Sequence, residues 1–563
     1  MTNERIPMWN IFRNPIFIKC ARARLRWKQL IAWSIIMLTT TSFVFLAVFL
    51  NVVERGKSTE LAAKGAFVPI LVLQSIVMMF LGTSRVAAGM AQEKHSGTLN
   101  FQRLTPMSPI SKIFGYLFGL PIREYVLFAL TLPFMAVIVV YGKISLLKVL
   151  HFYGVFFSTV MLYHMFGMVS GMITPKVRWS SRLSNFAAVF FVVSLYIFMP
   201  MLNRFGFTFL GFVTIFPTFY GIVMEELTQH RTGIARQKMI EELQRWQDVQ
   251  FFSQPIHPTT YTLLIQGLLL LTCFVIMVRK WRQQHNHAFS KTYSLGLFAA
   301  FQLLLMGSLW PFLTQVRVFN RFLKQIGRLS PETYGMSMFY IFFFLSGVMA
   351  FLLVHVVTPE WFTYIKGLRR AKKLGHSRIL PRSDASSNLF YGLSFIVMTW
   401  VSFWVLMKLS ASDGKIFLDM PPLSARVGLC CMFGTLIFAI MVLRELFGSK
   451  GFFFSLFVLW VVPFFVAVIV TSAWKQSILG SYILTLTPVT SFFFGVMNLK
   501  VPSGLLLPSK NNIRELLPHL PYLMWTSVAV YGAIGVAGMV MLFGKKARVK
   551  QQEEKRAERR KGA

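Results

Sequence analysis

Residues 31–53 read IAWSIIMLTTTSFVFLAVFLNVV, a run without a single charged side chain. Such a run can cross the roughly 30 Å hydrocarbon core of a bilayer, which takes about 20 helical residues. The whole chain of 563 residues is 55% hydrophobic and 15% aromatic, which is too apolar for a soluble protein of this length. The sequence therefore predicts an integral membrane protein.

Similar apolar runs recur along the chain and predict an all-α polytopic membrane protein with about twelve transmembrane helices. They lie at residues 31–53, 65–89, 124–142, 149–173, 183–203, 260–278, 293–312, 335–357, 388–407, 427–443, 451–473 and 520–543. Two further apolar stretches, 205–223 and 477–497, are interrupted by Gly, Thr and Pro. These interruptions are typical of re-entrant or interfacial segments rather than of clean crossings.

The net charge of +38 could indicate a nucleic-acid partner, because basic chains neutralise phosphate. The distribution of charge argues against that interpretation. If the N-terminus is cytoplasmic and the spans alternate, most Lys and Arg fall on the cytoplasmic side, densest at 13–28, 366–382 and 545–561. This is the positive-inside bias of membrane proteins. We therefore expect both termini in the cytoplasm, membrane lipids as partners and no nucleic acid.

An internal repeat organises the chain. Thr-x-x-Pro occurs at Thr214/Pro217 and again at Thr485/Pro488, each time after a Phe-rich span and before a polar segment and one last span. This predicts two tandem six-helix units, each with a re-entrant segment before its last span. Six is an even number of crossings, so the units would insert in parallel orientation. Convergent use of Thr and Pro at membrane breaks is the alternative.

The N-terminal segment predicts an interfacial helix before the first span. Asn14 can cap this helix and Pro15 suits its first turn. Lys19, Arg22 and Arg26 would then share one face on the cytoplasmic leaflet. An ordinary basic flank that orients the first span is the alternative, and the two interpretations are compatible.

These features predict the following parts of the chain: an N-terminal cytoplasmic segment 1–30; a first six-span unit 31–290 with a cytoplasmic loop 90–123 and an extracytoplasmic segment 224–259; a second six-span unit 291–544 with a cytoplasmic loop 358–388 and an extracytoplasmic segment 498–519; and a basic cytoplasmic tail 545–563. The extracytoplasmic segment 224–259 has apolar residues at near-helical spacing, which predicts a small amphipathic cap.

The loop after the second span is unusually rich in structural signals. Residues 92–104 predict a short polar helix in which Leu99 and Phe101 supply apolar contacts and Gly97 loosens the middle. Ser108 followed by Pro109 then predicts the start of a new helix. Two helices at an angle on the cytoplasmic face could form a rigid handle through which a soluble partner moves the spans.

This loop resembles a known family. Residues 93–125, EKHSGTLNFQRLTPMSPISKIFGYLFGLPIREY, are similar to the loop between the second and third spans in permease subunits of ATP-binding-cassette exporters of the second type. The matching residues are Glu93, Ser96, Gly97, Thr98, Leu99, Thr105, Pro106, Ser108, Pro109 and Gly115. In that family the loop is the coupling helix that docks on the ATPase, the basic segment before the first span is an elbow helix, and broken helices follow the fifth span.

The resemblance implies a permease in the bacterial plasma (inner) membrane, coupled to separate ATPase subunits that hold ATP and Mg. The residues it assigns to ATPase coupling are Glu93, Ser96, Gly97, Thr98, Leu99, Arg103, Thr105 and Pro106. It further implies an elbow helix with Pro15, Arg22 and Arg26, and breaks at Thr214, Pro217, Thr485 and Pro488. Export of lipids, polysaccharides, drugs or peptides would follow, and no residue chooses among them.

The second half departs from the family pattern. Its loop 358–388 has Thr358-Pro359 and a basic run but no Ser-Gly-Thr-Leu. Docking of an ATPase there is therefore predicted by position only. Either the second unit binds an ATPase differently or it has lost the contact, and a homodimer is an alternative if the second unit does not complete the pathway. A merely solvated charged loop is the remaining interpretation for 366–382.

We expect no enzymatic activity from this chain alone. It contains no GxxxxGK[ST] phosphate-binding loop, no HExxH and no Cys-x-x-Cys, so no cofactor is expected in it. His164 is expected to be a bonded core residue, and Glu124 beside Arg123 to form an internal salt bridge. Two alternatives to an ATP-driven permease stay open: a secondary transporter, which the shortage of intramembrane carboxylates disfavours, and a non-transporting membrane scaffold that kept the fold.

Overall fold

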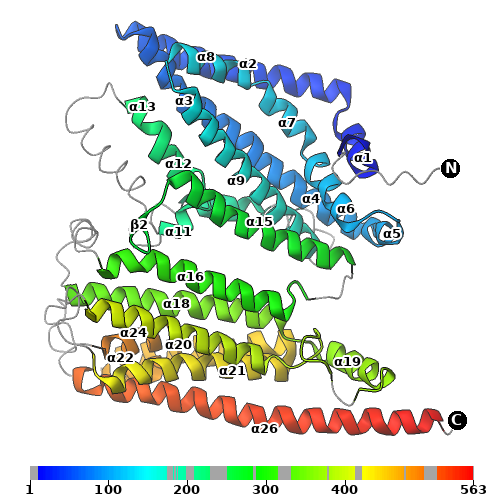
Figure 1. The fold of residues 1–563 in the computed structure, drawn as a ribbon, viewed down its shortest axis with the longest axis vertical. Helices are drawn as coiled ribbons and strands as arrows, with labels where there is room; N and C mark the ends of the chain where they lie inside the picture. The colour runs from blue at the N-terminus through cyan, green and yellow to red at the C-terminus, as the bar shows by residue number, and fades with distance from the viewer. Residues whose placement is uncertain are drawn as a thin grey trace. The chain divides into compact units, whose positions relative to one another are not determined.

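The chain divides into two compact units, residues 1–286 and 287–563, both built almost entirely of helices (Figure 1). The computed structural model describes residues 11–173, 182, 186, 188–197, 208–228, 250–282, 287–314, 331–376, 379–412, 421–473, 477–499 and 516–561. Most residues of the predicted segments 224–259 and 498–519 therefore fall outside the described residues, as do 183–185, 187 and 198–203 of the predicted span 183–203 and the N-terminal residues before Ile11.

The described residues of the first unit form helices and one two-stranded hairpin. Its elements are η1 (Ile11–Arg13), α1 (Pro15–Arg24), α2 (Trp27–Glu54), α3 (Thr59–Ser75), the π-helical η2 (Ile76–Gly82), α4 (Thr83–His95), α5 (Thr98–Leu104), α6 (Pro109–Gly119), α7 (Ile122–Ala129), α8 (Leu132–Tyr141), α9 (Leu146–Ile173), a helix at Ala188–Ile197, α11 (Thr208–Gly211), α12 (Phe216–Thr218), the π-helical η3 (Phe219–Val223), α13 (Met224–Thr228), β1 (Gln250–Phe251), β2 (Gln254–Pro255) and α15 (Pro258–Arg282).

The second unit contains longer and fewer helices. Its elements are α16 (Lys291–Thr314), α18 (Pro331–Val357), α19 (Trp361–Lys373), α20 (Leu389–Ser412), α21 (Leu423–Leu456), the π-helical η4 (Phe457–Val461), α22 (Val462–Ala473), α23 (Ser477–Leu484), α24 (Pro488–Met497), η5 (Leu517–His519) and α26 (Leu520–Lys561). Gly448, at φ +69°, divides α21 into two helices.

Eleven helices in the described part of the chain are long and apolar enough to cross a membrane. They are Trp27–Glu54, Thr59–His95, Ile122–Tyr141, Leu146–Ile173, Pro258–Arg282, Lys291–Thr314, Gly335–Val357, Leu389–Leu409, Leu423–Ser449, Gly451–Ser472 and Leu520–Arg556. A bent pair, Ile478–Leu484 and Pro488–Met497, makes a twelfth if it is counted as one span. The predicted all-α polytopic membrane protein is thereby confirmed.

Contacts at the ends of the helices show that the chain of the first unit runs back and forth between two ends. At one end, which we call the basic end, Arg103 Nη2 donates to the carbonyl of Lys280 at 3.2 Å and Lys94 Nζ to that of Ile173 at 3.3 Å. At the other end, the backbone N–H of Ser145 donates to Glu226 Oε2 at 2.7 Å. The chain must therefore cross the unit between 173 and 226, and the helix Ala188–Ile197 lies in that interval.

The second unit has a corresponding end, which we call its basic end. Arg444 pairs with Glu360 at 2.9 Å, Lys545 Nζ donates to the carbonyl of Leu446 at 3.0 Å, and Asn388 Nδ2 donates to Thr358 Oγ1 at 2.8 Å. The C-terminal end of α18, the part of α21 just before Gly448 and the part of α26 around Lys545 therefore lie together. Two of the three basic runs that the positive-inside argument places in the cytoplasm, 366–382 and 545–561, begin beside this end.

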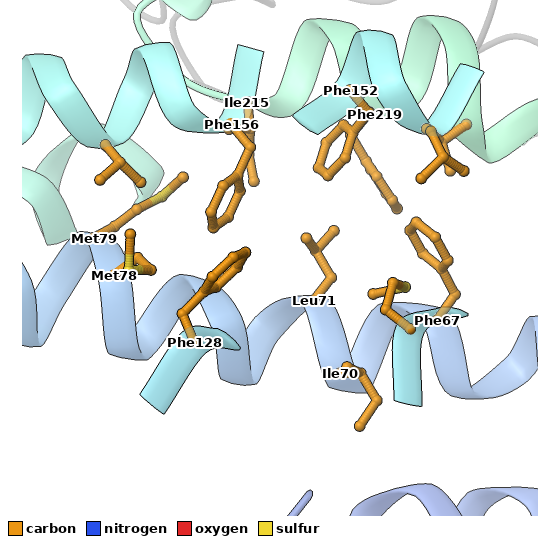
Figure 2. Close-up of a cluster of buried hydrophobic side chains, with 14 of the residues drawn as sticks. Phe67, Ile70, Leu71, Met78, Met79, Phe128, Phe152, Phe156, Ile215 and Phe219 are labelled. Carbon is orange, nitrogen blue, oxygen red and sulfur yellow. The ribbon is translucent and has the colours of Figure 1, made fainter. Parts of the chain in front are cut away.

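The core of the first unit is an aromatic cluster formed by α3, η2, α7, α9 and the segment around Phe219. Figure 2 shows Phe67, Phe128, Phe152, Phe156 and Phe219 facing one another across it. Lipid chains are as apolar as these side chains, so close packing and interhelical hydrogen bonds have to hold the helices together. The rings of Phe128 and Phe156 stack at 5.8 Å, and those of Phe152 and Phe219 meet edge to face at 6.0 Å.

Buried glutamines supply the interhelical hydrogen bonds in both units. In the first, Gln74 donates to Thr131 Oγ1 at 2.9 Å and accepts from the Tyr153 hydroxyl at 2.7 Å. In the second, Gln302 donates to the hydroxyls of Ser346 and Thr399 at 3.0 and 3.2 Å. Each glutamine therefore links three consecutive transmembrane segments.

His164 is a bonded core residue, as expected. It is fully buried on α9, where its Nε2 donates to the carbonyl of Met78 at 3.0 Å and its Nδ1 accepts from the hydroxyl of Tyr125 at 3.1 Å. Gly82 allows the imidazole to approach, because a Cβ at that position would lie 2.5 Å from Nε2. His164 therefore fixes the π-helical segment η2 against α7.

We expect His164→Leu to lower the thermal midpoint of the detergent-purified protein. The substitution leaves the carbonyl of Met78 and the hydroxyl of Tyr125 without their partner, at a cost of about 1–3 kcal/mol for each orphaned group. His151→Leu, at an exposed position of the same helix, is the control and should change the midpoint little. Equal effects of the two substitutions would contradict the role assigned to His164.

Candidate functional site

The loop 90–123 forms three helices at the basic end of the first unit. The span helix that begins at Thr59 continues through α4 to His95. Gly97, at φ +79°, breaks the helix there, and α5 then starts at Thr98. The left-handed conformation favours Gly because it has no Cβ to clash. The break therefore occurs at Gly97. The sequence predicts one helix over residues 92–104 with this Gly in its middle, and the structure has two helices instead.

The second half of the loop begins as predicted. Ser108 caps α6 by accepting from the backbone N–H of Ser111 at 3.1 Å, and Pro109 occupies the first turn. Thr105 ends α5, with its hydroxyl donating to the carbonyl of Gln102 at 2.7 Å. The turn between α5 and α6 is thus defined by side-chain hydrogen bonds on both sides.

A buried lysine forms hydrogen bonds to the backbone of this turn. Lys112 is almost fully buried, and its Nζ donates to the carbonyls of Gln102 and Thr105, the former at 2.5 Å. Gln102 Nε2 in turn donates to the hydroxyl of Tyr116 at 2.5 Å. Burial and the nearby Arg103 lower the pKa of Lys112. The ammonium replaces water as the donor to the last carbonyls of α5.

Arg103 anchors α5 rather than facing outward. Its Nη1 donates to Asn100 Oδ1 at 2.5 Å and its Nη2 to the carbonyl of Lys280, near the end of α15. Desolvation lowers its pKa. The basic residue assigned to ATPase coupling by resemblance therefore ties the loop to the last span of its own unit.

The predicted coupling residues differ in exposure. Ser96 and Pro106 are exposed, Leu99 is buried, and Glu93, Gly97, Thr98, Arg103 and Thr105 are intermediate. The sequence prediction that both Leu99 and Phe101 make apolar contacts is half right. Phe101 is 69% exposed, and Leu104, which no sequence argument singled out, is 84% exposed. The signal in the sequence that could have identified this exposed pair was two apolar residues, Phe101 and Leu104, three positions apart in a polar loop.

The helix α1 packs against this loop. Asn14 caps it as predicted, accepting from the N–H of Ile16 at 2.9 Å, and its amide also donates to the carbonyl of Ser111 at 2.7 Å. Lys19 pairs with Glu93 at 2.8 Å. Pro15 and Arg22 are exposed on α1, whereas Arg26 lies beyond it, because Leu25 leaves the helical conformation at ψ 43°.

Two glycines of α6 allow this close packing. A Cβ at Gly115 would lie 2.8 Å from Asn14 Oδ1, and one at Gly119 would lie 2.8 Å from the Cβ of Cys20 and 3.3 Å from the Cα of Phe17. Burial raises the pKa of the Cys20 thiol to about 11. Any side chain at Gly119 would therefore separate α1 from α6.

The two Thr-x-x-Pro breaks share their local geometry. The hydroxyl of Thr214 donates to the carbonyl of Gly211 at 2.8 Å, and that of Thr485 to Tyr482 at 2.6 Å, three residues earlier in both cases. Pro217 and Pro488 each lie at the start of the next helix. At the second break α23 and α24 meet at 117°.

In both units the last span supports the break. In the first, Gln266 Nε2 donates to the carbonyl of Phe212 at 3.3 Å and to Thr159 Oγ1 at 2.9 Å. In the second, the hydroxyl of Tyr531 donates to the carbonyl of Leu486, and Ser527 donates to Ser491 at 3.2 Å. Carbonyls freed by the interrupted helix are thus satisfied inside the protein.

The part of the second unit corresponding to the loop is α19. It lies against the C-terminal helix, where Arg369 forms a two-pronged ion pair with Glu553 at 2.7 and 2.8 Å. This pairing raises the pKa of Arg369. Trp361 Nε1 donates to the carbonyl of Leu446 at 3.2 Å. Contacts within its own unit therefore hold α19 in place.

The fold and these contacts define a multi-pass α-helical membrane protein with a braced helical loop at one end of its first unit. Within the described ranges, no group of three or more His, Cys, Asp or Glu side chains is placed to hold a metal ion. Comparison with family models, curated proteins and solved structures finds no match to the chain.

We expect Gly119→Ala to speed alkylation of Cys20. The new methyl group has to displace α1, which exposes the thiol and returns its pKa towards the ordinary range, so more of the reactive thiolate forms. The measurement is the rate of maleimide labelling in a background lacking the other three cysteines.

Gly154→Ala is the matched control for this substitution. A Cβ at Gly154 meets no atom within 4 Å, so labelling of Cys20 should stay at the wild-type rate. An unchanged rate in Gly119→Ala as well would show that α1 does not depend on this glycine.

Proposed function

We propose that this chain is the permease component of an ATP-driven transporter of the ATP-binding-cassette class, an exporter coupled to separate ATPase subunits through the loop at 92–115. The observation that carries the proposal is α5, which presents Phe101 and Leu104 to solvent while its other side is fastened to the unit. Exposed apolar side chains on a rigid element are typical of a protein interaction site. ATP and Mg would be held by the partner.

The bracing of α5 suits transmission of force. Arg103 connects α5 to α15, Lys112 connects it to α6, and Glu93 connects α4 to α1 through Lys19. In addition, α4 continues directly into the span that begins at Thr59. A partner pressing on Phe101 and Leu104 would therefore move several spans together rather than bend one loop.

The proposed topology places both basic ends in the cytoplasm of a bacterium, with the protein in the inner membrane. The excess of Lys and Arg in 13–28, 366–382 and 545–561 supports this orientation. The proposal treats the units as two six-span halves in parallel orientation. The segments at Thr214 and Thr485 would be re-entrant, supported by their shared hydrogen-bond pattern and by the 117° bend.

We further propose that the two units meet the ATPase differently. Phe362 of α19 and its C-cap residue Leu374 are exposed, but Arg369 is paired with the protein's own helix α26. It also lacks the Ser-Gly-Thr-Leu pattern. The alternative in which two chains combine into a homodimer would use two copies of α5.

Two other functions remain to be separated from this one by experiment. A secondary transporter would continue to work after ATP depletion while an ion gradient is maintained. A scaffold would bind partners without transport. The buried carboxylates among the described residues, Glu124 and Glu445, lie at the ends of spans and are ion-paired, which favours ATP-driven transport over proton relay.

We expect the double substitution Phe101→Ser and Leu104→Ser to abolish co-purification of an ATPase with the tagged chain and to abolish ATP-dependent transport. Both side chains are exposed, so the fold should be unaffected. Truncating central apolar contacts commonly costs more than 2 kcal/mol each, or over tenfold in affinity.

Phe362→Ser with Leu374→Ser is the matched control, since it removes the same kinds of exposed side chain from α19 and its C-cap in the second unit. We expect it to affect association less. Association and transport that survive the change in α5 would refute coupling through this loop, and transport by the purified chain alone in liposomes would refute the class.

A further inference from the structure

Three helical segments of the first unit, α2, η2 and α7, bury side chains against one another at one level and leave side chains exposed one turn further along. Met37 of α2, Val77 of η2 and Leu127 of α7 form a small buried cluster. One helical turn towards the basic end, the same three helices carry Trp33, Leu81 and Arg123. Trp33 and Leu81 are 42% and 45% exposed. An apolar surface open to the membrane therefore begins where the buried cluster ends.

Arginines surround this opening on the side of the basic end. Arg123 pairs with Glu124 Oε1 at 2.8 Å, and Arg85, one turn beyond Leu81, lies 3.8 Å from the same oxygen. The guanidinium of Arg123 lies 5.2 Å from the ring centre of Trp33. Arg24 is the last residue of α1, a helix that packs against α7, which carries Arg123.

The charges in this cluster do not balance. Among the described residues, Glu124 is the single carboxylate paired with these arginines, and it is almost fully buried, so it compensates only one of three guanidinium groups. Arg123 Nε is buried and has no hydrogen-bond partner. Concentrating like charges costs free energy unless an anion is present. The cluster therefore has the electrostatics of an anion site, and its neighbour is an exposed apolar surface.

We infer that Arg24, Arg85 and Arg123 bind the phosphate headgroup of an anionic phospholipid whose acyl chain lies along Trp33 and Leu81. Basic pockets between transmembrane helices on the cytoplasmic side suit such headgroups, and guanidinium groups suit phosphate oxygens. A soluble phosphate ester would bind the arginines but would leave the apolar side chains of Trp33 and Leu81 uncovered, whereas a phospholipid also covers them with its acyl chain. The site depends on the membrane topology and not on the proposed ATPase.

Bound lipid would connect the helices that carry the loop. The site joins α1, α2, α7 and the span that continues into α4, and α1 is itself fastened to α4 through Lys19 and Glu93. An anionic headgroup would therefore hold α1 against the helices on which α5 depends.

The test compares binding of phosphatidylglycerol and phosphatidylcholine to the full-length protein in detergent, measured by native mass spectrometry and by the shift in thermal midpoint. We expect the wild type to retain phosphatidylglycerol preferentially. Arg24→Gln with Arg85→Gln should weaken that binding by about fivefold for each guanidinium removed. Arg123 is left in place because it neutralises the buried Glu124.

Arg22→Gln with Arg26→Gln is the matched control, because it removes the same charge from the same end at exposed positions. We expect phosphatidylglycerol binding within about twofold of the wild type. Equal losses in the two double variants would show that overall charge, not this site, binds lipid, and no loss in Arg24→Gln with Arg85→Gln would overturn the site. Displacement of the lipid by excess inorganic phosphate would overturn the lipid assignment in favour of a soluble anion.

Discussion

Every departure from helical geometry in this protein is subject to one constraint: backbone polar groups inside a bilayer need partners within the protein, because no water reaches them. The π-helical segment η2 meets it through His164, which donates to the carbonyl of Met78. The Thr-x-x-Pro breaks meet it through their own threonines and through Gln266 or Tyr531 of the last span. Buried side chains therefore bond backbone carbonyls in both kinds of irregular segment.

The same constraint explains why polar residues connect neighbouring spans. Gln74 and Gln302 each bond to side chains of two other helices, which specifies the neighbours more sharply than apolar packing does. The aromatic cluster around Phe128 and Phe156 then fills the space that these bonds define (Figure 2). Specificity and close packing thus come from different residue types.

Hydropathy and cap residues predict most of the helices. The predicted span 335–357 is found at Gly335–Val357, and Asn14 and Ser108 cap helices as their positions indicate. These features are predictable because they depend on nearby residues. The connection between predicted spans 427–443 and 451–473 shows the limit of such predictions. In the structure these two helices extend to Ser449 and from Gly451, and the chain turns between them at Gly448, which has a φ of +69°.

The support of the loop was not predictable in the same way. Lys112 reads as an ordinary basic residue of an amphipathic helix, and its burial follows from carbonyls that are brought near only once α5 and α6 fold against each other. The bond of Arg103 to Lys280 joins residues far apart in the chain. The periodicity of a sequence reports which residues share a face of one helix and carries no information about contacts between distant segments.

The two basic ends differ in what holds them. In the first unit the exposed side chains Phe101 and Leu104 project from a helix whose hydrogen-bond partners lie on α6 and α15. In the second unit, α26 extends well past the length that a bilayer requires and holds α19 through Glu553, while Lys546 pairs with the buried Glu445. A partner that bound α19 in the way that we propose for α5 would have to compete with α26. In the described part of the chain, the exposed apolar side chains of α5 are therefore accessible, whereas α19 is held by α26, which is the structural reason to propose unequal roles for the two units.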